Sequence, residues 1–188
     1  MLITDRFRLP TATQQDAAAM ARYYQVNWDH LHPWEPQRRA DPRQLTYWQA
    51  QLRQQEADHV AQNGLMLVIR TKEQADNHAD ILGVIRFSQV ARGPFQACYL
   101  GFGLAQAAVG RGIMQEALTA AIDHIFDDWR LHRIMANYLP RNRRSSALLE
   151  RLGFVKEGLA KDYLQINGIW EDHVLTAKSN KALAPSPV

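Results

Sequence analysis

The sequence contains little cysteine and no long apolar run. Its one cysteine, Cys98, rules out an internal disulfide, so a reducing compartment is the simplest location. No stretch reaches the roughly 18 apolar residues that a membrane span needs. The first ten residues, MLITDRFRLP, also lack the apolar segment of a secretory signal. These absences predict a cytoplasmic protein that does not enter a membrane.

Lysine is also scarce, since 17 of the 22 basic residues are arginine, and the net charge is +3. The planar guanidinium group suits phosphates and carboxylates better than an ammonium group does. One basic run contains Arg141, Arg143 and Arg144, but no aromatic residues are interleaved with it for base stacking. No specific nucleic-acid site is therefore predicted, while an encounter with the ribosome stays open.

Both common nucleotide fingerprints are missing. A G-x-G-x-x-G motif would need glycine where Gln115 stands, and no G-x-x-x-x-G-K-[ST] motif occurs. The sequence does have Gly110-Arg111-Gly112 where a strand-like segment gives way to a helix. Free amides at a helix N-terminus, next to glycines without a Cβ atom, can bind an anion. The same glycines can simply form a tight turn, and the residues alone leave both interpretations open.

The hydrophobic pattern predicts a mixed α/β (α+β) fold in the order β-α-α-β-β-β-α-β-α-β-β. Short connections between successive strands favour a mostly antiparallel sheet flanked by helices, and Asn167-Gly168 predicts a hairpin. One parallel crossover is expected through the helix after Gly112. The expected strands cover 2–9, 65–70, 81–90, 96–104, 132–139, 155–166 and 169–177.

Four helices are expected between these strands, over 17–28, 42–62, 112–126 and 142–152. Asp16 is expected to cap the first helix, and Pro42 is expected to open the second. A single domain is expected over 1–178, followed by a flexible, polar tail over 179–188.

A series of motifs surrounds the glycine turn. GRGIMQEALTAAIDHIF is followed by HRIMANYLPRN and by a short helix that ends in Leu152-Gly153-Phe154. This half of the sequence resembles the acetyl-CoA-binding half of the GNAT acetyltransferases, which have a Q/R-x-x-G-x-G/A turn for the CoA pyrophosphate. One departure is visible, because Ala107 stands where that family has Gln or Arg. The resemblance favours the anion-binding interpretation of the turn.

Further strings extend the resemblance over residues 33–177, namely PWEP, ACYLGFGL, EALTAAI, HRIMANY, RLGFVKEG, AKDYL and W-x-DHVLTA. In this order they resemble the RimJ/RimL subgroup, most closely its RimJ-type ribosomal-protein alanine N-acetyltransferases. The resemblance implies the GNAT fold, acetyl-CoA as cosubstrate and direct attack by a protein N-terminal α-amine without a covalent enzyme intermediate. The implied partner is the N-terminal peptide of a small-subunit ribosomal protein that begins with alanine.

The resemblance also assigns cofactor-binding residues to three segments. A backbone amide near Gly101–Gly103 would polarise the thioester carbonyl, and these glycines could mark a bulge or be close-packing positions. The glycine turn would hold the pyrophosphate, and Asn142 would bond the pantetheine arm or merely cap a helix. The full set is Gly101, Phe102, Gly103, Ala107, Val109, Gly110, Arg111, Gly112, Ile113, Asn142, Arg144 and Ser145.

Three side chains are candidates for proton transfer. Ser145 is the candidate acid for the leaving thiolate, with helix capping as its alternative role, and Tyr138 is the substitute acid or a core residue. Glu35, in the PWEP loop, is the candidate carboxylate on the amine side, with Trp34 as a wall of the acceptor site. Asp162 and Asp172 are rivals for holding a water there, although Asp172 more simply forms a local hydrogen bond with His173.

Several alternatives stay open at this stage. The acceptor could be a small amine such as an aminoglycoside, a polyamine or an amino acid, and the protein could be a non-enzymatic CoA- or RNA-associated member of the fold. His30 and His32 show no metal-ligand spacing, so no metal is predicted. Cys98 is expected to be buried rather than to act as a nucleophile. Either a monomer or a homodimer is compatible with the sequence.

Overall fold

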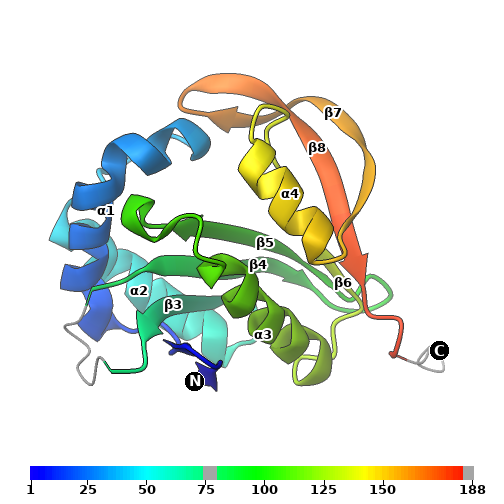
Figure 1. Ribbon diagram of the computed structural model, residues 1–188, viewed down its shortest axis with the longest axis horizontal. Helices are drawn as coiled ribbons and strands as arrows, with labels where there is room; N and C mark the ends of the chain where they lie inside the picture. Colours follow the sequence, from blue (N-terminus) through cyan, green and yellow to red (C-terminus); the bar gives the residue numbers. More distant parts are fainter. Residues whose placement is uncertain (74–79, 184–188) are drawn as a thin grey trace.

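The computed structural model describes residues 1–73 and 80–183. Its centre is an eight-stranded sheet in the order β1-β2-β3-β4-β5-β6-β8-β7 (Figure 1). Every neighbouring pair is antiparallel except β5 and β6, which are parallel. The mixed, mostly antiparallel sheet predicted from the sequence is therefore confirmed. None of the helices in these two ranges is long and apolar enough to cross a membrane.

The elements follow the expected chain order. The strands are β1 (Leu2–Ile3), β2 (Phe7–Leu9), β3 (Leu65–Thr71), β4 (Gly83–Ala91), β5 (Ala97–Leu104), β6 (Arg133–Met135), β7 (Val155–Ile166) and β8 (Ile169–Ser179). The α-helices are α1 (Ala17–Leu31), α2 (Leu45–Val60), α3 (Ile113–Asp127) and α4 (Arg143–Arg151). Short 3₁₀ helices are η1 (Gln14–Asp16), η2 (His32–Trp34) and η3 (Gln106–Ala108).

Helices cover both faces of the sheet, and each face has its own apolar core. On one face α3 and α4 pack over residues such as Cys98 and Ile134. On the other face α1 and α2 pack over Met66 and Val68. The first six residues of β3 are all buried, because successive side chains enter opposite cores. This explains why the sequence LMLVIR is nearly continuous in apolar character.

Several expected boundaries are wrong. The first strand is two short strands that pair with each other, and α2 begins at Leu45 instead of Pro42 because residues 42–44 form a turn. The first helix continues to Leu31 across a kink at Asn27, whose φ of −110° is not helical. β8 includes Ser179, and the Asn180 amide donates to His132 O at 2.7 Å, so the expected tail begins too early.

The parallel pair β5–β6 is short, and the two strands then part. Their register joins only Ala97–Tyr99 to Arg133–Met135, whereas β5 continues to Leu104 with β4 as its neighbour. The expected strand over 132–139 is shortened accordingly, and Tyr138 keeps only a bridge to Val174. The irregularity between β4 and β5 lies between Ser88 and Ala91. Gly101 and Gly103 are in regular register, so their interpretation as a bulge is wrong. Because β6 ends early, the part of β5 after Tyr99 has no paired strand on the β6 side. This interruption of the sheet is called the gap beside β5.

A buried ion pair fastens the start of α1 to the sheet. Arg70 on β3 donates to Asp16 Oδ1 at 2.8 Å, and both side chains are almost fully buried. Asp16 stands at the N-cap position, but its other oxygen accepts from the Thr13 amide at 2.8 Å instead of from the first turn of α1. The expected side-chain cap is therefore replaced by a tertiary contact.

We predict that Asp16→Asn lowers the free energy of unfolding by about 3 kcal/mol, because the buried guanidinium loses its charged partner. Asp41→Asn removes the partner of Arg43 at the surface and should lower the free energy of unfolding far less. Urea denaturation of both variants measures the difference. Equal, small losses would show that the Asp16–Arg70 pair contributes little.

Candidate functional site

The glycine turn lies at the exposed N-terminus of α3. Gly110 and Gly112 have φ values of +83° and +71°, a region that residues with a Cβ atom rarely adopt. No side chain caps α3, whose first helical bond runs from the Glu116 amide to Gly112 O at 3.1 Å. Apart from the adjacent residues of the chain, no atom of the described residues lies within 4 Å of the place that a Gly110 Cβ would occupy. The turn thus presents helix N-terminal amides and open space to an approaching anion.

The segment before the turn is fixed by a residue that the sequence did not reveal. Asn27, at the kink of α1, accepts a hydrogen bond from the Gln106 amide at 2.8 Å and donates to Tyr23 O at 2.9 Å. Ala107 is exposed in η3 and offers no polar side-chain atom. The signal in the sequence was an asparagine among the apolar positions of a helical pattern. It does not identify the partner of Asn27, which is 79 residues away.

The gap next to β5 is lined by glycines on one face of the sheet. Gly101 is exposed, and within residues 1–73 and 80–183 only its chain neighbours come within 4 Å of its Cβ position. At Gly103 a Cβ would stand 3.4 Å from the Tyr23 hydroxyl and 3.5 Å from Leu31, so this glycine serves close packing of α1. Phe102 points to the opposite face and packs against the α3–α4 core. Gly101 therefore places no side chain on this face of β5.

The N-terminus of α4 faces the same end of β5. Asn142 caps this helix, since its side chain accepts from the Ser145 amide at 3.1 Å. Helix capping is one of the two roles expected for this residue. The Ser146 hydroxyl donates to the Tyr138 hydroxyl at 3.0 Å, while Ser145 Oγ makes no hydrogen bond to the described residues. Tyr138 also packs against the larger core. The hydroxyls of Ser145 and Tyr138 thus both remain able to donate a proton.

The end of α1 and the start of α4 also interact electrostatically. Burial first, and then the nearby Arg144 cation, hold the pKa of His30 below its ordinary value. Arg144 itself is exposed on the first turn of α4. The end of α1 and the start of α4 are therefore close neighbours across the end of β5, as Figure 1 shows.

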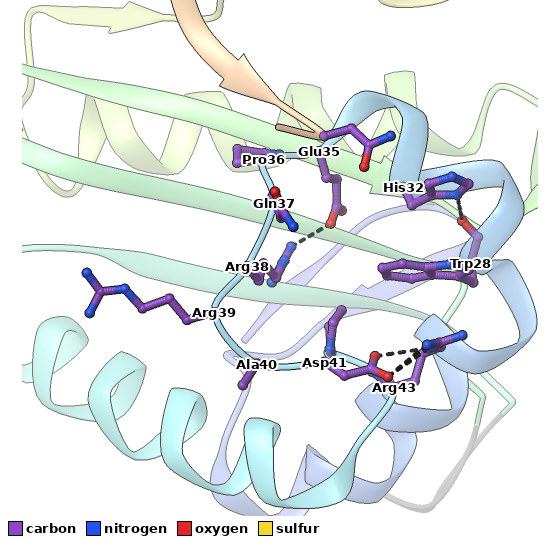
Figure 2. A pocket seen from close by; sticks show the side chains of 12 residues that line it. Trp28, His32, Glu35, Pro36, Gln37, Arg38, Arg39, Ala40, Asp41 and Arg43 are labelled. Carbon is purple, nitrogen blue, oxygen red and sulfur yellow. Dashed lines mark hydrogen bonds and ion pairs between the residues drawn. The ribbon is translucent and has the colours of Figure 1, made fainter. Parts of the chain in front are cut away.

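Glu35 lies in a dense polar and aromatic cluster, of which Figure 2 shows the pair with Arg38. Its Oε2 atom is 2.6 Å from Arg38, and its Oε1 atom accepts from the Tyr24 hydroxyl at 2.9 Å. The Arg38 guanidinium also donates to the Tyr47 hydroxyl at 2.8 Å and lies over the rings of Tyr24, Tyr47 and Trp48. Burial raises the pKa of Tyr24, and the Glu35 charge adds to the effect, so Tyr24 stays a donor. The carboxylate is therefore held in one orientation by Arg38 and Tyr24.

The loop that carries Glu35 is joined to the tip of the β7–β8 hairpin. The Asn167 amide donates to Glu35 O at 3.1 Å, and Pro36 forms a bridge with Ile166. Trp34, with 39% of its surface exposed, lies under the Arg141 guanidinium, which in turn pairs with Glu171 on β8 at 2.7 Å. These contacts hold the PWEP loop, the approach to α4 and the hairpin together.

A cavity of about 280 Å³ lies beside this loop (Figure 2). Its charged lining contains Glu35 and Asp41, but also three arginines, so it does not favour a polycation. None of the residues of the glycine turn or of α4 lines it. The lining residues are Trp28, His32, Glu35, Pro36, Gln37, Arg38, Arg39, Ala40, Asp41, Pro42, Arg43 and Asn167.

The rival carboxylates belong to a different part of the hairpin. Asp162 is exposed at a positive φ of 48° in the irregular part of β7, and its amide donates to Asp172 Oδ1 at 3.1 Å. Asp172 also accepts from Lys161 at 2.6 Å, so its side chain bonds to β7 across the hairpin. The expected partner of His173 is wrong, because its Nδ1 atom contacts Glu171 O at 3.0 Å instead of Asp172.

A tyrosine cluster on the Gly101 face was also missed. The hydroxyls of Tyr99 and Tyr163 are 3.4 Å apart, and Asn137 donates to the Tyr163 hydroxyl at 3.3 Å. The hydrogen bond with Tyr99, followed by burial, raises the pKa of Tyr163 to about 12. The alternation of strand β5 places Tyr99 on the same side as Gly101, but only the fold brings Tyr163 to it.

Cys98 has no features of a nucleophile. It is buried in the α3–α4 core, and burial raises the pKa of its thiol to about 12, so the thiolate is scarcely populated at neutral pH. Over residues 1–73 and 80–183, no group of three or more His, Cys, Asp or Glu side chains could hold a metal ion.

Comparison with known sequences agrees with this geometry. The sequence profile of the acetyltransferase (GNAT) domain matches residues 6–155 of the chain. Because this match spans well over half of the chain, the protein belongs to the GNAT family and is an acetyltransferase.

Individual proteins and solved structures resemble the chain over nearly its whole length. The chain is 44% identical over 184 residues to the [ribosomal protein uS5]-alanine N-acetyltransferase of Escherichia coli K12, covering 98% of this chain and 93% of that protein. The crystal structure of the ribosomal-protein-S5-alanine acetyltransferase from Vibrio fischeri matches with a TM-score of 0.90, 38% identity and 98% coverage of both chains. Mycobacterium smegmatis RimJ in complex with CoA-disulfide matches with a TM-score of 0.85, 30% identity and coverage of 97% and 90%.

Proposed function

We propose that this protein transfers an acetyl group from acetyl-CoA to the N-terminal α-amine of ribosomal protein uS5, whose first residue would be alanine. The observation that carries the proposal is the 44% identity to the Escherichia coli enzyme of that name, which extends over nearly all of both chains. A ribosomal acceptor places the reaction in the cytoplasm, where the arginine-rich surface would favour an encounter with the ribosome.

Acetyl-CoA supplies an activated acetyl thioester, and the residues at the end of β5 fit such a ligand. The uncapped N-terminus of α3 and the open space at Gly110 suit the pyrophosphate, and the parting of β5 from β6 suits the pantetheine arm. Arg144, exposed on the first turn of α4, is proposed as a contact for the phosphorylated end of the cofactor. The proposed binding residues are Gly101, Phe102, Gly103, Ala107, Val109, Gly110, Arg111, Gly112, Ile113, Asn142, Arg144 and Ser145.

The acceptor amine needs little help to become a nucleophile. An N-terminal α-amine has a pKa of about 7.7–8.0, so a sizeable fraction is neutral at pH 7, whereas lysine, near 10.4, is almost fully charged. Glu35 is already paired with Arg38 and Tyr24, which suits it to orient the amine or a water rather than to act as a strong base. Trp34 would wall the acceptor site, and Asp162 is a second carboxylate for it.

Two hydroxyls are proposed as the acid that protonates the leaving sulfur. Ser145 Oγ is uncommitted among the described residues, and the Tyr138 hydroxyl accepts from Ser146, which leaves its own proton available. Both belong to the segment that faces the end of β5. Proton transfer from a positioned group of this kind contributes about 10²–10⁴-fold to a rate.

The glycine turn gives the first prediction from this proposal. Gly110→Asp combined with Gly112→Asp should weaken CoA binding at least about 100-fold, because strained backbone and two carboxylates replace an open anion site. Gly93→Asp is the matched control, since Gly93 also has a positive φ of 67° and open space around it but lies between β4 and β5. Isothermal titration with CoA measures both, and equal affinities would remove the turn from the cofactor site.

Glu35 gives the second prediction. Glu35→Gln should lower kcat for an alanine-starting peptide by about 100-fold while the KM for acetyl-CoA stays within about twofold, because the carboxylate faces the amine and not the cofactor. Glu56→Gln is the control, since Glu56 accepts similar hydrogen bonds from Gln14 at the far end of the α1–α2 layer. An unchanged kcat would exclude Glu35 from the chemistry.

An acceptor panel tests the proposed function itself. The protein is incubated with acetyl-CoA and, separately, with the N-terminal peptide of uS5, a serine-starting peptide, a lysine peptide with a blocked N-terminus and an aminoglycoside. We expect acetylation of the uS5 peptide at its α-amine at a rate at least about tenfold above every other acceptor, measured by mass spectrometry. Acetylation of the aminoglycoside alone would show that the acceptor is a small amine instead. If none of the four acceptors is acetylated, the proposed function is contradicted.

A further inference from the structure

The glycine turn is tied to the N-terminal hairpin by a cluster that the proposed chemistry does not use. Glu116, on the first turn of α3, accepts from the Thr4 hydroxyl at 2.6 Å and from the Arg6 amide at 2.9 Å through Oε1. Its Oε2 atom accepts from Arg6 Nε at 2.7 Å. A segment more than 100 residues away in sequence is thereby bound to the base of the turn.

Arg6 also reaches the backbone of the turn. Its Nη1 atom donates to Arg111 O at 3.2 Å, and its Nη2 atom lies 3.6 Å from where a Gly112 Cβ would stand. A trans peptide group is planar, with its N–H opposite to its C=O. By holding the Arg111 carbonyl, Arg6 fixes the following Gly112 N–H on the opposite side, away from the N-terminal hairpin. Arg6 thus sets the orientation of one amide in the turn.

The charge of Glu116 would otherwise oppose an anion at this helix end. Burial acts to raise the pKa of Glu116, but hydrogen bonds from Thr4 and Arg6 outweigh it and hold this pKa below its ordinary value. The carboxylate is therefore ionised at neutral pH. A carboxylate so close to the start of α3 would repel a phosphate group, and the Arg6 guanidinium compensates this charge.

We propose that Arg6 is a positioning residue for the CoA pyrophosphate: anchored by Glu116, it orients the Arg111–Gly112 peptide and neutralises the carboxylate beside the anion site. The inference rests on the proposed function, since it assumes that the glycine turn holds the pyrophosphate. Its alternative is a purely structural link. Arg6 and Glu116 have 52% and 21% of their side chains exposed, and ion pairs of this kind contribute little to stability.

The test separates these roles by measuring cofactor binding directly. Arg6→Met, Arg6→Lys, Glu116→Gln and the Arg6→Met/Glu116→Gln double variant are titrated with CoA by calorimetry. We expect Arg6→Met to raise the Kd for CoA about tenfold, and the double variant to recover about half of that loss on a logarithmic scale because the uncompensated carboxylate is gone. Arg6→Lys should keep the charge but lose the bond to Arg111 O, giving an intermediate Kd.

A cofactor without the pyrophosphate supplies the second readout. For Arg6→Met, the ratio of kcat/KM with acetyl-CoA to kcat/KM with S-acetylpantetheine should fall about tenfold, because only acetyl-CoA has the group that the turn would bind. Arg92→Met is the matched control, since Arg92 also donates to a backbone carbonyl, Trp129 O at 2.7 Å, which lies just past the C-terminal end of α3, at the opposite end of the helix from the glycine turn. Urea denaturation verifies that each variant is folded.

The outcomes distinguish the two proposals. The role of Arg6 is overturned if Arg6→Met leaves the Kd for CoA unchanged, or if it lowers kcat/KM equally for acetyl-CoA and S-acetylpantetheine. The cofactor site would still be supported in that case, provided that the wild type binds CoA and the Gly110/Gly112 variant does not. If the Gly110/Gly112 variant binds CoA as the wild type does, the turn is not the pyrophosphate site, and the inference about Arg6 fails with it.

Discussion

The short parallel contact between β5 and β6 is the constraint on which the rest of the site depends. Three residue pairs join the strands, after which β5 continues along β4 and β6 ends. The backbone of β5 near Gly101 is thereby left without a neighbour on one side. The two helices that follow, α3 and α4, begin close to this gap, so their N-termini and the free edge of β5 converge. A cofactor with a phosphorylated end and a thin thioester arm fits such an arrangement.

Much of this could be predicted from local patterns. The glycine pair with positive φ, the Asn142 cap and the Asn167-Gly168 hairpin each depend on residues only a few positions apart, and the structure contains all three. The order of elements followed from hydrophobic periodicity and short connections. The family could be recognised because its motifs surround the turn in a fixed order.

The contacts that tune the site could not be predicted in this way. Arg6 meets Glu116, Asn27 meets the Gln106 amide, and Asn167 meets the Glu35 carbonyl across long sequence separations. Each depends on how helices and loops pack after the sheet has formed, and no periodicity encodes the partner. For the same reason the sequence indicated Glu35 but not the Arg38–Tyr24 cluster, whose aromatic members are on α1 and α2. The acceptor side is thus shaped mainly by tertiary contacts.

Backbone amide shifts during a CoA titration, followed by nuclear magnetic resonance, test the central claim most directly. If the gap beside β5 and the start of α3 hold the cofactor, the largest changes will be at Gly101–Gly103, Gly110–Ile113 and Asn142–Ser145. The amides around Gly93 and in β1 and β2 will change little, whereas the Arg6 amide, between these two strands, will shift. Changes confined to the cavity beside Glu35, with none at Gly110 or Gly112, would contradict the account.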